Sequence, residues 1–517
     1  MPGLTENIHL LSPEFALVGL ALLVFAVDLA LPVGKKGLVP WLSIAGLIGV
    51  LALSLQMLWG RQELLYDGLL GVDAFSLFFK VFFLGLGVLI ILASMEYVDR
   101  FLETPGEFYG LLILSILGMS VMVQARELLT AYIALELLSF NLYVLAAYAR
   151  SEPRSNEAGL KYILIGAFSS AILLYGLSMI YSTLGVTKYP DIALALSAAG
   201  ELSPALWAGV ALLMAGLAFK VAAAPFHMWA PDVYEGAPLP VTAYLAIGST
   251  TAAFALILRL AAEGFLPAGG LWSQWQLVVA VLAAVSMLVG NLVALAQHNI
   301  KRLMAYSSIG HTGFILAGVA ALTPDSPLAS NAVMLYLAGY AVTNLVVFAG
   351  IIAYFNRTGR ELIADFAGLA GEQPFLAAAI AIGLFSLGGL PIFAGFAIKF
   401  YLFIALAESG FLWLAGLAIF SSLISLYYYL QIIRQMYIEP GAELSEAAIG
   451  DVRNEAVPDQ QREPPEPVLT GASWFAPPGL LLGVLAVGLL AVVLIGVYPA
   501  PLLDLIEAAS QAILPGV

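Results

Sequence analysis

The chain has 517 residues, of which 62% are hydrophobic and only 10% charged. A soluble domain carries roughly 25% charged residues, so this composition excludes an ordinary soluble enzyme and indicates a polytopic protein of the lipid bilayer. The absence of cysteine excludes cysteine-ligated iron–sulfur clusters, and the net charge of −14 argues against nucleic acid as a partner.

Hydropathy predicts an all-α membrane protein with fourteen transmembrane helices, because the apolar runs reach the ~20 residues that cross a bilayer. The predicted spans cover residues 12–31, 38–59, 72–95, 107–123, 127–149, 157–184, 205–234, 239–262, 274–296, 301–322, 328–355, 374–407, 410–438 and 477–499. Helix-breaking residues predict that the seventh and twelfth spans are discontinuous. The amphipathic tail, residues 500–517, is expected to lie along the membrane surface.

Basic residues are distributed unequally between the two sets of loops. One set, which follows spans 1, 3, 5, 9, 11 and 13, holds Lys35, Lys36, Arg100, Arg150, Arg154, Lys301, Arg302, Arg357, Arg360, Arg434, Arg453 and Arg462. The opposite set holds only Arg61, Arg126, Lys188 and Arg259. Because cytoplasmic loops are enriched in Lys and Arg, we expect both termini on the outer side of the plasma membrane.

One segment departs from the membrane pattern. Residues 439–470 are acidic, rich in proline and poor in aromatic residues, which predicts a flexible cytoplasmic loop. It is interpreted either as a variable spacer or as a docking segment for a soluble partner.

Two ionisable residues lie deep in apolar sequence in the first half of the chain. Glu136 is nine residues past Glu127, so helical rise places its carboxylate about 13 Å into the span. Lys220 precedes Pro225, which interrupts the seventh span. An ammonium at mid-membrane costs ~2.5–3.5 kcal/mol, so such residues are usually functional. Glu136 and Lys220 are interpreted as a pair, either a titrating proton switch or a static link between two helices.

A second buried lysine, Lys399, follows an interruption at Gly389 and Pro391 in the twelfth span. In the seventh span the lysine precedes the break, and in the twelfth it follows the break. This mirrored placement predicts an inverted repeat of spans 4–8 and 9–13. The expected units are 1–106 (helices 1–3), 107–262 (first repeat), 263–438 (second repeat), 439–476 (acidic loop) and 477–517 (helix 14 and tail).

Four further residues have two interpretations each. Lys161 either extends to the membrane interface or modulates the Glu136–Lys220 pair. Lys80 is expected to have an interfacial or structural role. His227 is expected to cap or line the seventh-span break, and His311 is either a proton relay or a core histidine. No His, Asp or Glu spacing predicts a metal site.

At these residues the chain resembles a known family. ELLSFNLYVLAAY, LAFKVAAAPFHMWAPDVYEGAPLPVTAYLA, NIKRLMAYSSIGHTGF and LGGLPIFAGFAIKFY are similar to subunit N of bacterial complex I, the proton-pumping NADH:quinone oxidoreductase. The resemblance implies fourteen helices and a proton pathway through Glu136, Lys161, Lys220 and Lys399. It also implies neighbouring subunits M and K, no cofactor in this chain, and NADH, FMN, iron–sulfur clusters and quinone elsewhere in the complex.

The chain departs from this family at one position. Where the family has a lysine in the eighth span, this sequence has Thr250, between Ser249 and Thr251. A threonine cannot carry a proton as a cation, although its hydroxyl can order water. Either water at these hydroxyls bridges the gap, together with His311, or the subunit pumps differently or not at all.

Three functions follow as hypotheses. The first is a subunit of a respiratory dehydrogenase in the bacterial plasma membrane, which couples electron transfer in other subunits to proton movement. The second is a subunit of a multi-subunit Na⁺/H⁺ antiporter. The third is a scaffold subunit that does not pump. The VYEGAP segment and the number of spans favour the first.

Overall fold

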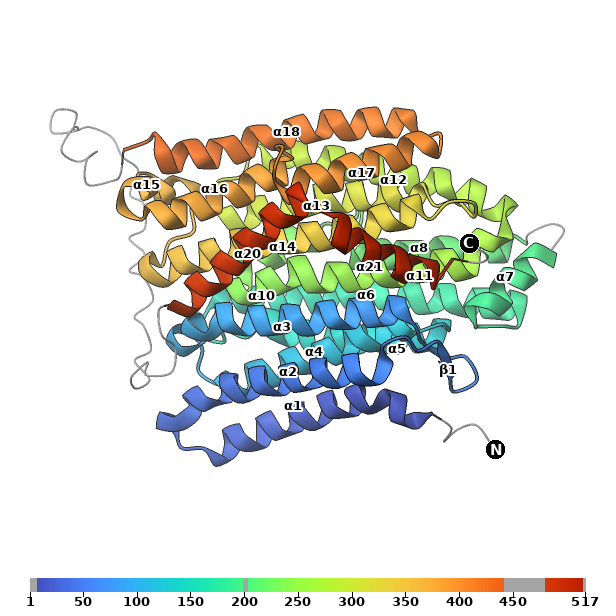
Figure 1. Ribbon diagram of the computed structural model, residues 1–517, viewed down its shortest axis with the longest axis horizontal. Helices are drawn as coiled ribbons and strands as arrows, with labels where there is room; N and C mark the ends of the chain where they lie inside the picture. Colours follow the sequence, from blue (N-terminus) through green and yellow to red (C-terminus); the bar gives the residue numbers. More distant parts are fainter. Residues whose placement is uncertain (1–6, 199–202, 441–478, 515–517) are drawn as a thin grey trace.

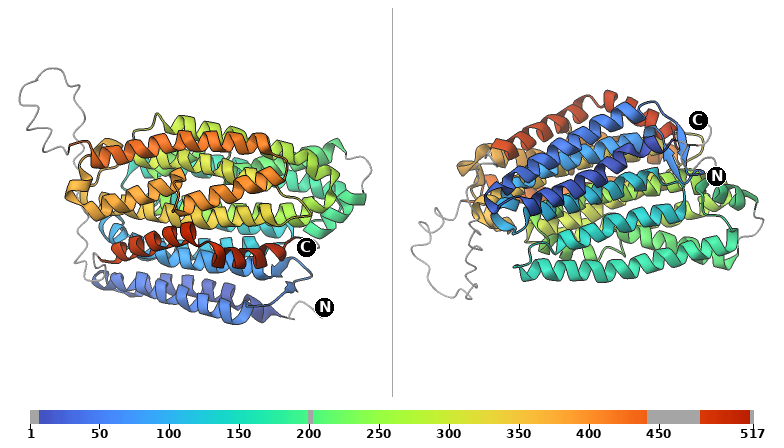
Figure 2. Two further views of the ribbon diagram at one scale, coloured as in Figure 1. Left: turned by 45° about the horizontal axis from the view of Figure 1, so that its top comes forward. Right: turned by 90° about the horizontal axis from the view of Figure 1, so that it is seen from below.

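The computed structural model describes residues 7–198, 203–440 and 479–514, and nearly all of these are helical. Most helices lie side by side in one bundle (Figures 1 and 2). In the described residues, twelve helices are long and apolar enough to cross a membrane. Two shorter apolar helices, Pro204–Lys220 and Pro374–Gly388, belong to the broken spans and complete the fourteen predicted spans. The predicted all-α polytopic fold is therefore confirmed.

The N-terminal helices form one edge of the bundle (Figure 1). They are η1 (Ile8–Leu11), α1 (Ser12–Ala30), η2 (Val33–Leu38), α2 (Val39–Leu58) and α3 (Ala74–Phe101), with a hairpin of β1 (Glu63–Leu65) and β2 (Leu70–Val72) before α3. The two strands are antiparallel, with Glu63 opposite Val72. Asp67 in the hairpin turn accepts a hydrogen bond from Lys188. This bond lowers the pKa of the Asp67 carboxyl below its usual range.

The next group of helices contains the first break. These elements are α4 (Pro105–Gln124), α5 (Leu128–Ala146), α6 (Pro153–Leu184), α7 (Tyr189–Ala198), α8 (Pro204–Lys220), α9 (Trp229–Gly236), α10 (Leu239–Tyr244), η3 (Leu245–Ser249), α11 (Thr250–Leu260), η4 (Ala261–Phe265) and η5 (Leu266–Ala268). Lys220 is the last residue of α8, and helix resumes only at Trp229. The predicted break in span 7 is therefore confirmed.

The following group contains the second break. It comprises α12 (Gly270–Ala294), α13 (Ile300–Ala320), α14 (Leu328–Thr358), η6 (Ile363–Phe366), α15 (Leu369–Glu372), α16 (Pro374–Gly388), α17 (Ala394–Glu408) and α18 (Leu412–Tyr437). Gly389 and Ile392, between α16 and α17, both have left-handed backbone conformations, with φ of 86° and 82°. The predicted break in span 12 is thereby confirmed. α13 and α14 are buried along almost their whole length and form the centre of the bundle.

The C-terminal helices α20 (Gly479–Val497) and α21 (Ala500–Gln511) cross the outside of the bundle one after the other (Figure 1). α21 packs beside α14 and α3, and the Ser510 hydroxyl donates a buried hydrogen bond to Ser330 on α14. The expectation that the tail lies along the membrane surface is therefore wrong for α21. Its buried face, with Ile506, Ala509 and Ser510, packs on the bundle instead.

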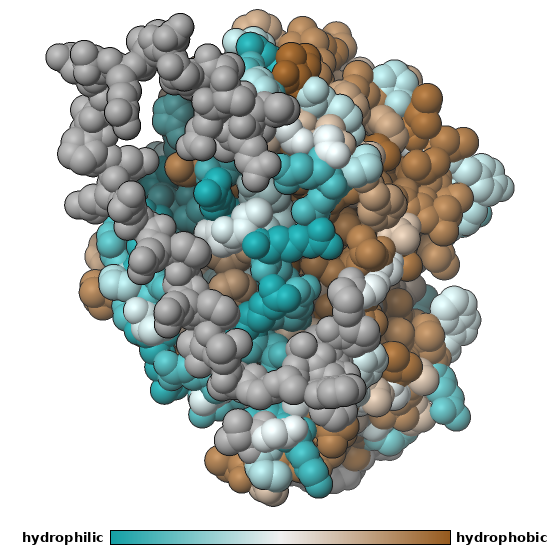
Figure 3. All heavy atoms as spheres, turned by 90° about the vertical axis from the view of Figure 1, so that its left-hand side faces the viewer, coloured by the Kyte–Doolittle hydropathy of each residue, from teal (hydrophilic) through white to brown (hydrophobic). Residues whose placement is uncertain are grey.

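The two ends of the bundle differ. α1 begins and α21 ends at the same end (Figure 1). Hydrophilic side chains gather on the opposite end, while hydrophobic side chains border them (Figure 3). The acidic segment predicted at 439–470 falls outside the described residues except for its first two positions.

Candidate functional site

Glu136 and Lys220 are both partly buried, and each is hydrogen-bonded to hydroxyl groups. Glu136, Ser139 and Tyr143 are three and seven residues apart on α5, so they share one face of the helix. Ser170 on α6 donates a hydrogen bond to Glu136. The Lys220 ammonium donates to the Ser139 hydroxyl at 2.7 Å and to the Tyr143 hydroxyl at 3.3 Å.

The expected direct ion pair between Glu136 and Lys220 is not formed. No salt bridge in the described part of the chain includes Glu136, and Lys220 bonds to hydroxyls instead. A carboxylate and an ammonium on neighbouring helices still stabilise each other's charge without direct contact, while each stays able to exchange a proton with its nearest hydroxyl.

Aromatic rings lie beside Lys220 and the break that follows it. Its ammonium lies 5.6 Å from the centre of the Tyr143 ring. Tyr162 contacts Tyr143 edge-on and stacks on Trp229 at 4.6 Å, with an interplanar angle of 8°. The Trp229 indole N–H donates to the Phe219 carbonyl, which is freed by the end of α8. The break in span 7 is thus filled by a rigid aromatic layer.

The second lysine is held across the break of its own span. Lys399 is 3% exposed, and its ammonium donates to the Leu387 carbonyl and to the Ser422 hydroxyl, each at 2.8 Å. It lies 5.2 Å from the centre of the Phe314 ring. No acidic residue within the described chain forms a salt bridge with Lys399. Because the end of α16 supplies a carbonyl, the break itself provides an acceptor for the ammonium.

Hydroxyl groups, not a third lysine, occupy the space between the two halves. Thr250 is buried directly after η3, a π-helical turn, and its hydroxyl donates to the Leu245 carbonyl. Tyr234 interacts with the hydroxyls of Thr250 and Ser308. Tyr340 donates to Ser308 at 3.0 Å. The Tyr234–Thr250–Ser308–Tyr340 group is called the hydroxyl bridge below.

His311 contacts Tyr340 of the hydroxyl bridge and also Phe314, the ring beside the second lysine. Its ring is 4.9 Å from the Tyr340 ring and 6.0 Å from the Phe314 ring that Lys399 also contacts. Its Nδ1 atom is 2.7 Å from the Tyr336 hydroxyl, and its Nε2 atom is 3.4 Å from the Tyr429 hydroxyl. With a hydroxyl at each ring nitrogen, His311 can accept a proton on one side and release one on the other.

The remaining predicted positions of the site are less connected. His227 lies in the span-7 break with no hydrogen-bond partner for its Nδ1 atom among the described residues, and Pro225 before it is exposed. Ser249 ends the π-helical turn, and the Thr251 hydroxyl is buried without a partner in that part of the chain. Pro391 lies between the two left-handed residues of the span-12 break.

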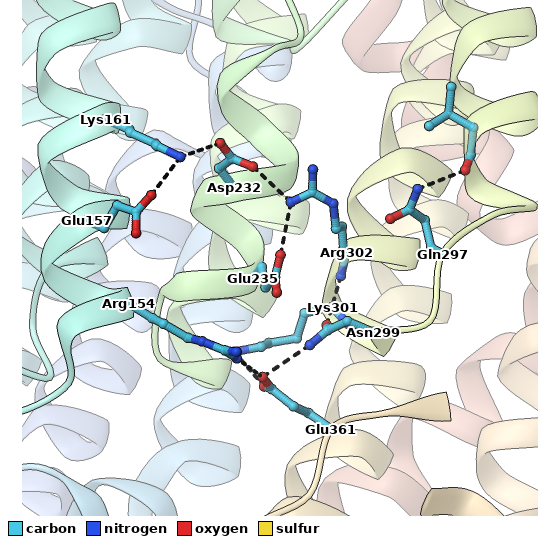
Figure 4. Close-up of polar contacts among 11 residues, drawn as sticks. Arg154, Glu157, Lys161, Asp232, Glu235, Gln297, Asn299, Lys301, Arg302 and Glu361 are labelled. Carbon is cyan, nitrogen blue, oxygen red and sulfur yellow. Dashed lines mark hydrogen bonds and ion pairs between the residues drawn. The ribbon is translucent and has the colours of Figure 1, made fainter. Parts of the chain in front are cut away.

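Lys161 belongs to an ion network at the polar end. It pairs with Glu157 at 2.8 Å and with Asp232 at 2.7 Å, and Asp232 also pairs with Arg302 (Figure 4). Arg302 binds Glu235 as well. Because Lys161 has these two acidic partners and is 41% exposed, it does not contact the Glu136 or Lys220 side chains.

A second set of charges lies beside this network. Glu361 pairs with Lys301 at 2.8 Å and with Arg154 at 3.3 Å, and accepts a hydrogen bond from Asn299 (Figure 4). Arg154 is on α6 and Lys301 is on α13, so the pairs link the first group of helices to the second at this end. Asp232, Glu235 and Glu361 were not identified from the sequence; their spacing carries no motif.

Lys80 lies in the interior and not at the membrane interface. Its side chain is 1% exposed and is paired with Glu14 of α1. The structural alternative for Lys80 therefore holds, as a buried link between α1 and α3. A buried ion pair adds little net stability, but removal of one partner leaves an uncompensated charge.

A third group of charges was missed in the sequence. Arg259, which was assigned to a loop, is fully buried and binds Asp73 through two hydrogen bonds of 2.8 Å. It also pairs with Glu263 one turn later, and Glu263 pairs with Arg126. The i,i+4 spacing of Arg259 and Glu263 was the available signal. This cluster joins α3, the α4–α5 connection and span 8.

Replacing Arg259 by methionine is expected to destabilise the subunit by about 3–5 kcal/mol, because Asp73 would remain buried without its cation. The measurement is the melting temperature of the purified complex in detergent. The control is Arg61→Met, since Arg61 is exposed. Equal melting temperatures for the two variants would contradict the prediction.

No group of three or more His, Asp or Glu residues that could hold a metal ion occurs in the described residues. Tyr234, Thr250, Ser308, Tyr340 and His311 are instead buried polar side chains of the interior. Tyr234, Tyr340 and Tyr429 were not singled out in the sequence, because a tyrosine in an apolar helix is most often a packing residue.

Comparisons with known proteins identify the family. Residues 125–425 match the family model described as NADH:quinone oxidoreductase/Mrp antiporter, TM. The NADH-quinone oxidoreductase subunit N of Desulforamulus reducens is 38% identical over 508 residues, covering 98% of this chain and 99% of its own length. That of Moorella thermoacetica is 39% identical over 496 residues, covering 96% of this chain and 97% of its own length.

Solved structures show the same fold. A chain of respiratory complex I from Thermus thermophilus is 29% identical, with a TM-score of 0.75 over 96% of this chain and 99% of its own. A chain of the Mrp complex from Dietzia has a TM-score of 0.75 over 97% of each chain, but at 22% identity it shows the fold alone.

Proposed function

Because the chain belongs to the subunit N family of NADH-quinone oxidoreductase, we propose that it moves protons across the membrane through Glu136, Lys220 and Lys399. Electron transfer takes place in other subunits and drives this movement. The observation that carries the proposal is the row of buried polar groups between the two lysines, in a bundle whose surroundings are apolar. Lipid penalises such groups unless they serve a function.

The first half of the pathway works as a switch. When Glu136 is charged, it stabilises the ammonium of Lys220 through the hydroxyl layer of Ser139 and Tyr143. Loss of the charge on Glu136 favours release of a proton from Lys220. Water that enters the aromatic layer of Tyr162 and Trp229 then carries the released proton past these rings.

The second half receives the proton. The hydroxyl bridge, with Thr250 in place of a third lysine, passes it to His311 by successive exchange of hydrogen-bond donors and acceptors. Lys399 accepts it and releases it toward the outer side, past Ser422. Lys161, Ser249 and His227 support the pathway by their positions near its first half. Lys161 acts on Glu136 only by long-range electrostatics, because its direct partners are Glu157 and Asp232.

The two groups of helices fit an inverted repeat. We assign residues 107–262 to the first repeat and 263–438 to the second, preceded by helices 1–3 in 1–106. The acidic loop, 439–476, and helix 14 with its tail, 477–517, complete the chain. The mirrored order of lysine and break in α8 and α17 supports this assignment.

The lateral face at Glu136 points to a neighbour. Glu136 is partly exposed between the exposed apolar residues Ile133 and Phe140. A carboxylate facing lipid is costly, so another subunit covers this face. Subunits M and K are the proposed neighbours in the complex. NADH, FMN, iron–sulfur clusters and quinone are assigned to other subunits, and both termini to the outer side of the bacterial plasma membrane.

Glu136→Gln tests the switch. Glutamine keeps the shape and the hydrogen bond from Ser170 but cannot take up a proton. We expect the rate of proton translocation by the assembled complex in proteoliposomes to fall about tenfold. Glu103→Gln is the control, because Glu103 is exposed in a loop. Equal rates in the two variants would show that Glu136 is a structural residue.

A further inference from the structure

We propose that Gly496 of α20 is a positioning residue for Lys399, because it holds the break of span 12 in place. This inference rests on the proposed role of Lys399 in proton transfer. Gly496 is one residue before the end of α20, where the chain turns toward α21.

The contact is between two backbones. A Cβ atom on Gly496 would overlap the Ile392 carbonyl group and the Phe393 carbonyl carbon. Only glycine lets the end of α20 approach this peptide so closely, and the approach is suited to a weak hydrogen bond from the Gly496 Cα to the Ile392 carbonyl.

The peptide that Gly496 contacts is strained. Ile392 has a φ of 82°, in the left-handed region that β-branched residues avoid. Such a conformation persists only when the surrounding structure enforces it. Ile392 is 64% exposed, so packing of its side chain contributes little, whereas α20 lies directly against its backbone.

The strained residue sets where α17 begins. Phe393 is the N-cap residue of α17, and Lys399 lies six residues further along this helix. The Lys399 ammonium reaches back across the break to the Leu387 carbonyl on α16. This 2.8 Å bond therefore depends on how α16 and α17 are placed relative to each other. A shift of the Ile392–Phe393 peptide would lengthen it.

The same helix offers a matched control. Gly483 of α20 is exposed, and a Cβ atom there would meet nothing within 4 Å. Both Gly496→Ala and Gly483→Ala raise helix propensity equally. They differ only in whether the added methyl group meets the span-12 break.

The test uses the intact complex in proteoliposomes, with protons translocated per electron measured between pH 6 and 9. In Gly496→Ala we expect this ratio to fall about threefold and the pH profile to shift by about half a unit, since misplacement of a reacting group lowers its efficiency. Gly483→Ala should match wild type. An assembled Gly496→Ala complex with a wild-type ratio and pH profile would overturn the inference.

Two further variants separate the outcomes. If Lys399→Ala pumps normally, the proposed function fails; if it does not pump while Gly496→Ala pumps normally, only the positioning role fails. Should Gly496→Ala not assemble, the double variant Gly496→Ala with Ile392→Gly decides, because glycine lets the strained peptide move without cost. Restored assembly supports the contact, and no improvement over the single variant contradicts it.

Discussion

Complexes that carry Lys220→Ala are expected to translocate protons about tenfold or more slowly than wild type, because removal of a proton-transfer group typically costs at least this much. The loss has a specific origin. In the described structure, the Lys220 ammonium at the end of α8 is the only group of that helix that is hydrogen-bonded to the Ser139 and Tyr143 hydroxyls on α5. Initial rates of proton uptake, measured with a pH-sensitive dye in proteoliposomes, give the result.

Lys220→Arg separates proton transfer from charge. Arginine keeps the positive charge and the hydrogen bonds but does not release a proton at physiological pH. If Lys220 carries the proton, the arginine variant should be as slow as Lys220→Ala. If Lys220 only anchors α8 against α5, arginine should restore the rate. Lys35→Arg, at an exposed lysine in the connection between α1 and α2, is the control.

The positions of the two buried lysines and of the breaks could be predicted because both signals are local. A lysine and a proline within one apolar run are costly in lipid wherever the chain folds. Thus α8 ends at Lys220, and α17 begins shortly after Pro391, as the sequence predicted. Hydropathy located the spans for the same reason.

The contacts of the charges could not be predicted, because they depend on which faces meet. Glu136 and Lys220 are suitable partners by charge, yet Lys220 bonds to Ser139 and Tyr143 on α5 while Glu136 bonds to Ser170 on α6. Arg259 was counted as a loop residue because its neighbours in sequence gave no sign of Asp73 on α3. Long-range pairing of this kind is set by packing and not by local pattern.

The surroundings of α21 were also predicted wrongly. Its mixed apolar and small polar residues are typical of an interfacial helix. The same pattern also suits a helix that packs on the outer side of a helix bundle, where Ser510 is hydrogen-bonded to Ser330. Amphipathicity indicates that one face is buried, but it does not identify what covers that face.

His311→Phe is expected to slow proton translocation about tenfold, because it removes both ring nitrogens from the connection between the hydroxyl bridge and Lys399. Phenylalanine is similar in size and preserves the contact with Phe314, so packing changes little. His298→Phe, at an exposed histidine, is the control, and both variants are compared at equal amounts of assembled complex.

Substitution of Thr250 tests whether the hydroxyl bridge conducts protons without a third lysine. Thr250→Val removes the hydroxyl that interacts with Tyr234 and keeps the shape, so we expect the proton-translocation rate to fall about threefold, as for the loss of one hydrogen bond. Thr251→Val removes a neighbouring hydroxyl that has no partner in the described residues, and it should leave the rate unchanged. If the two valine variants pump equally fast, protons do not cross at Thr250, and the subunit must connect its two lysines by another route.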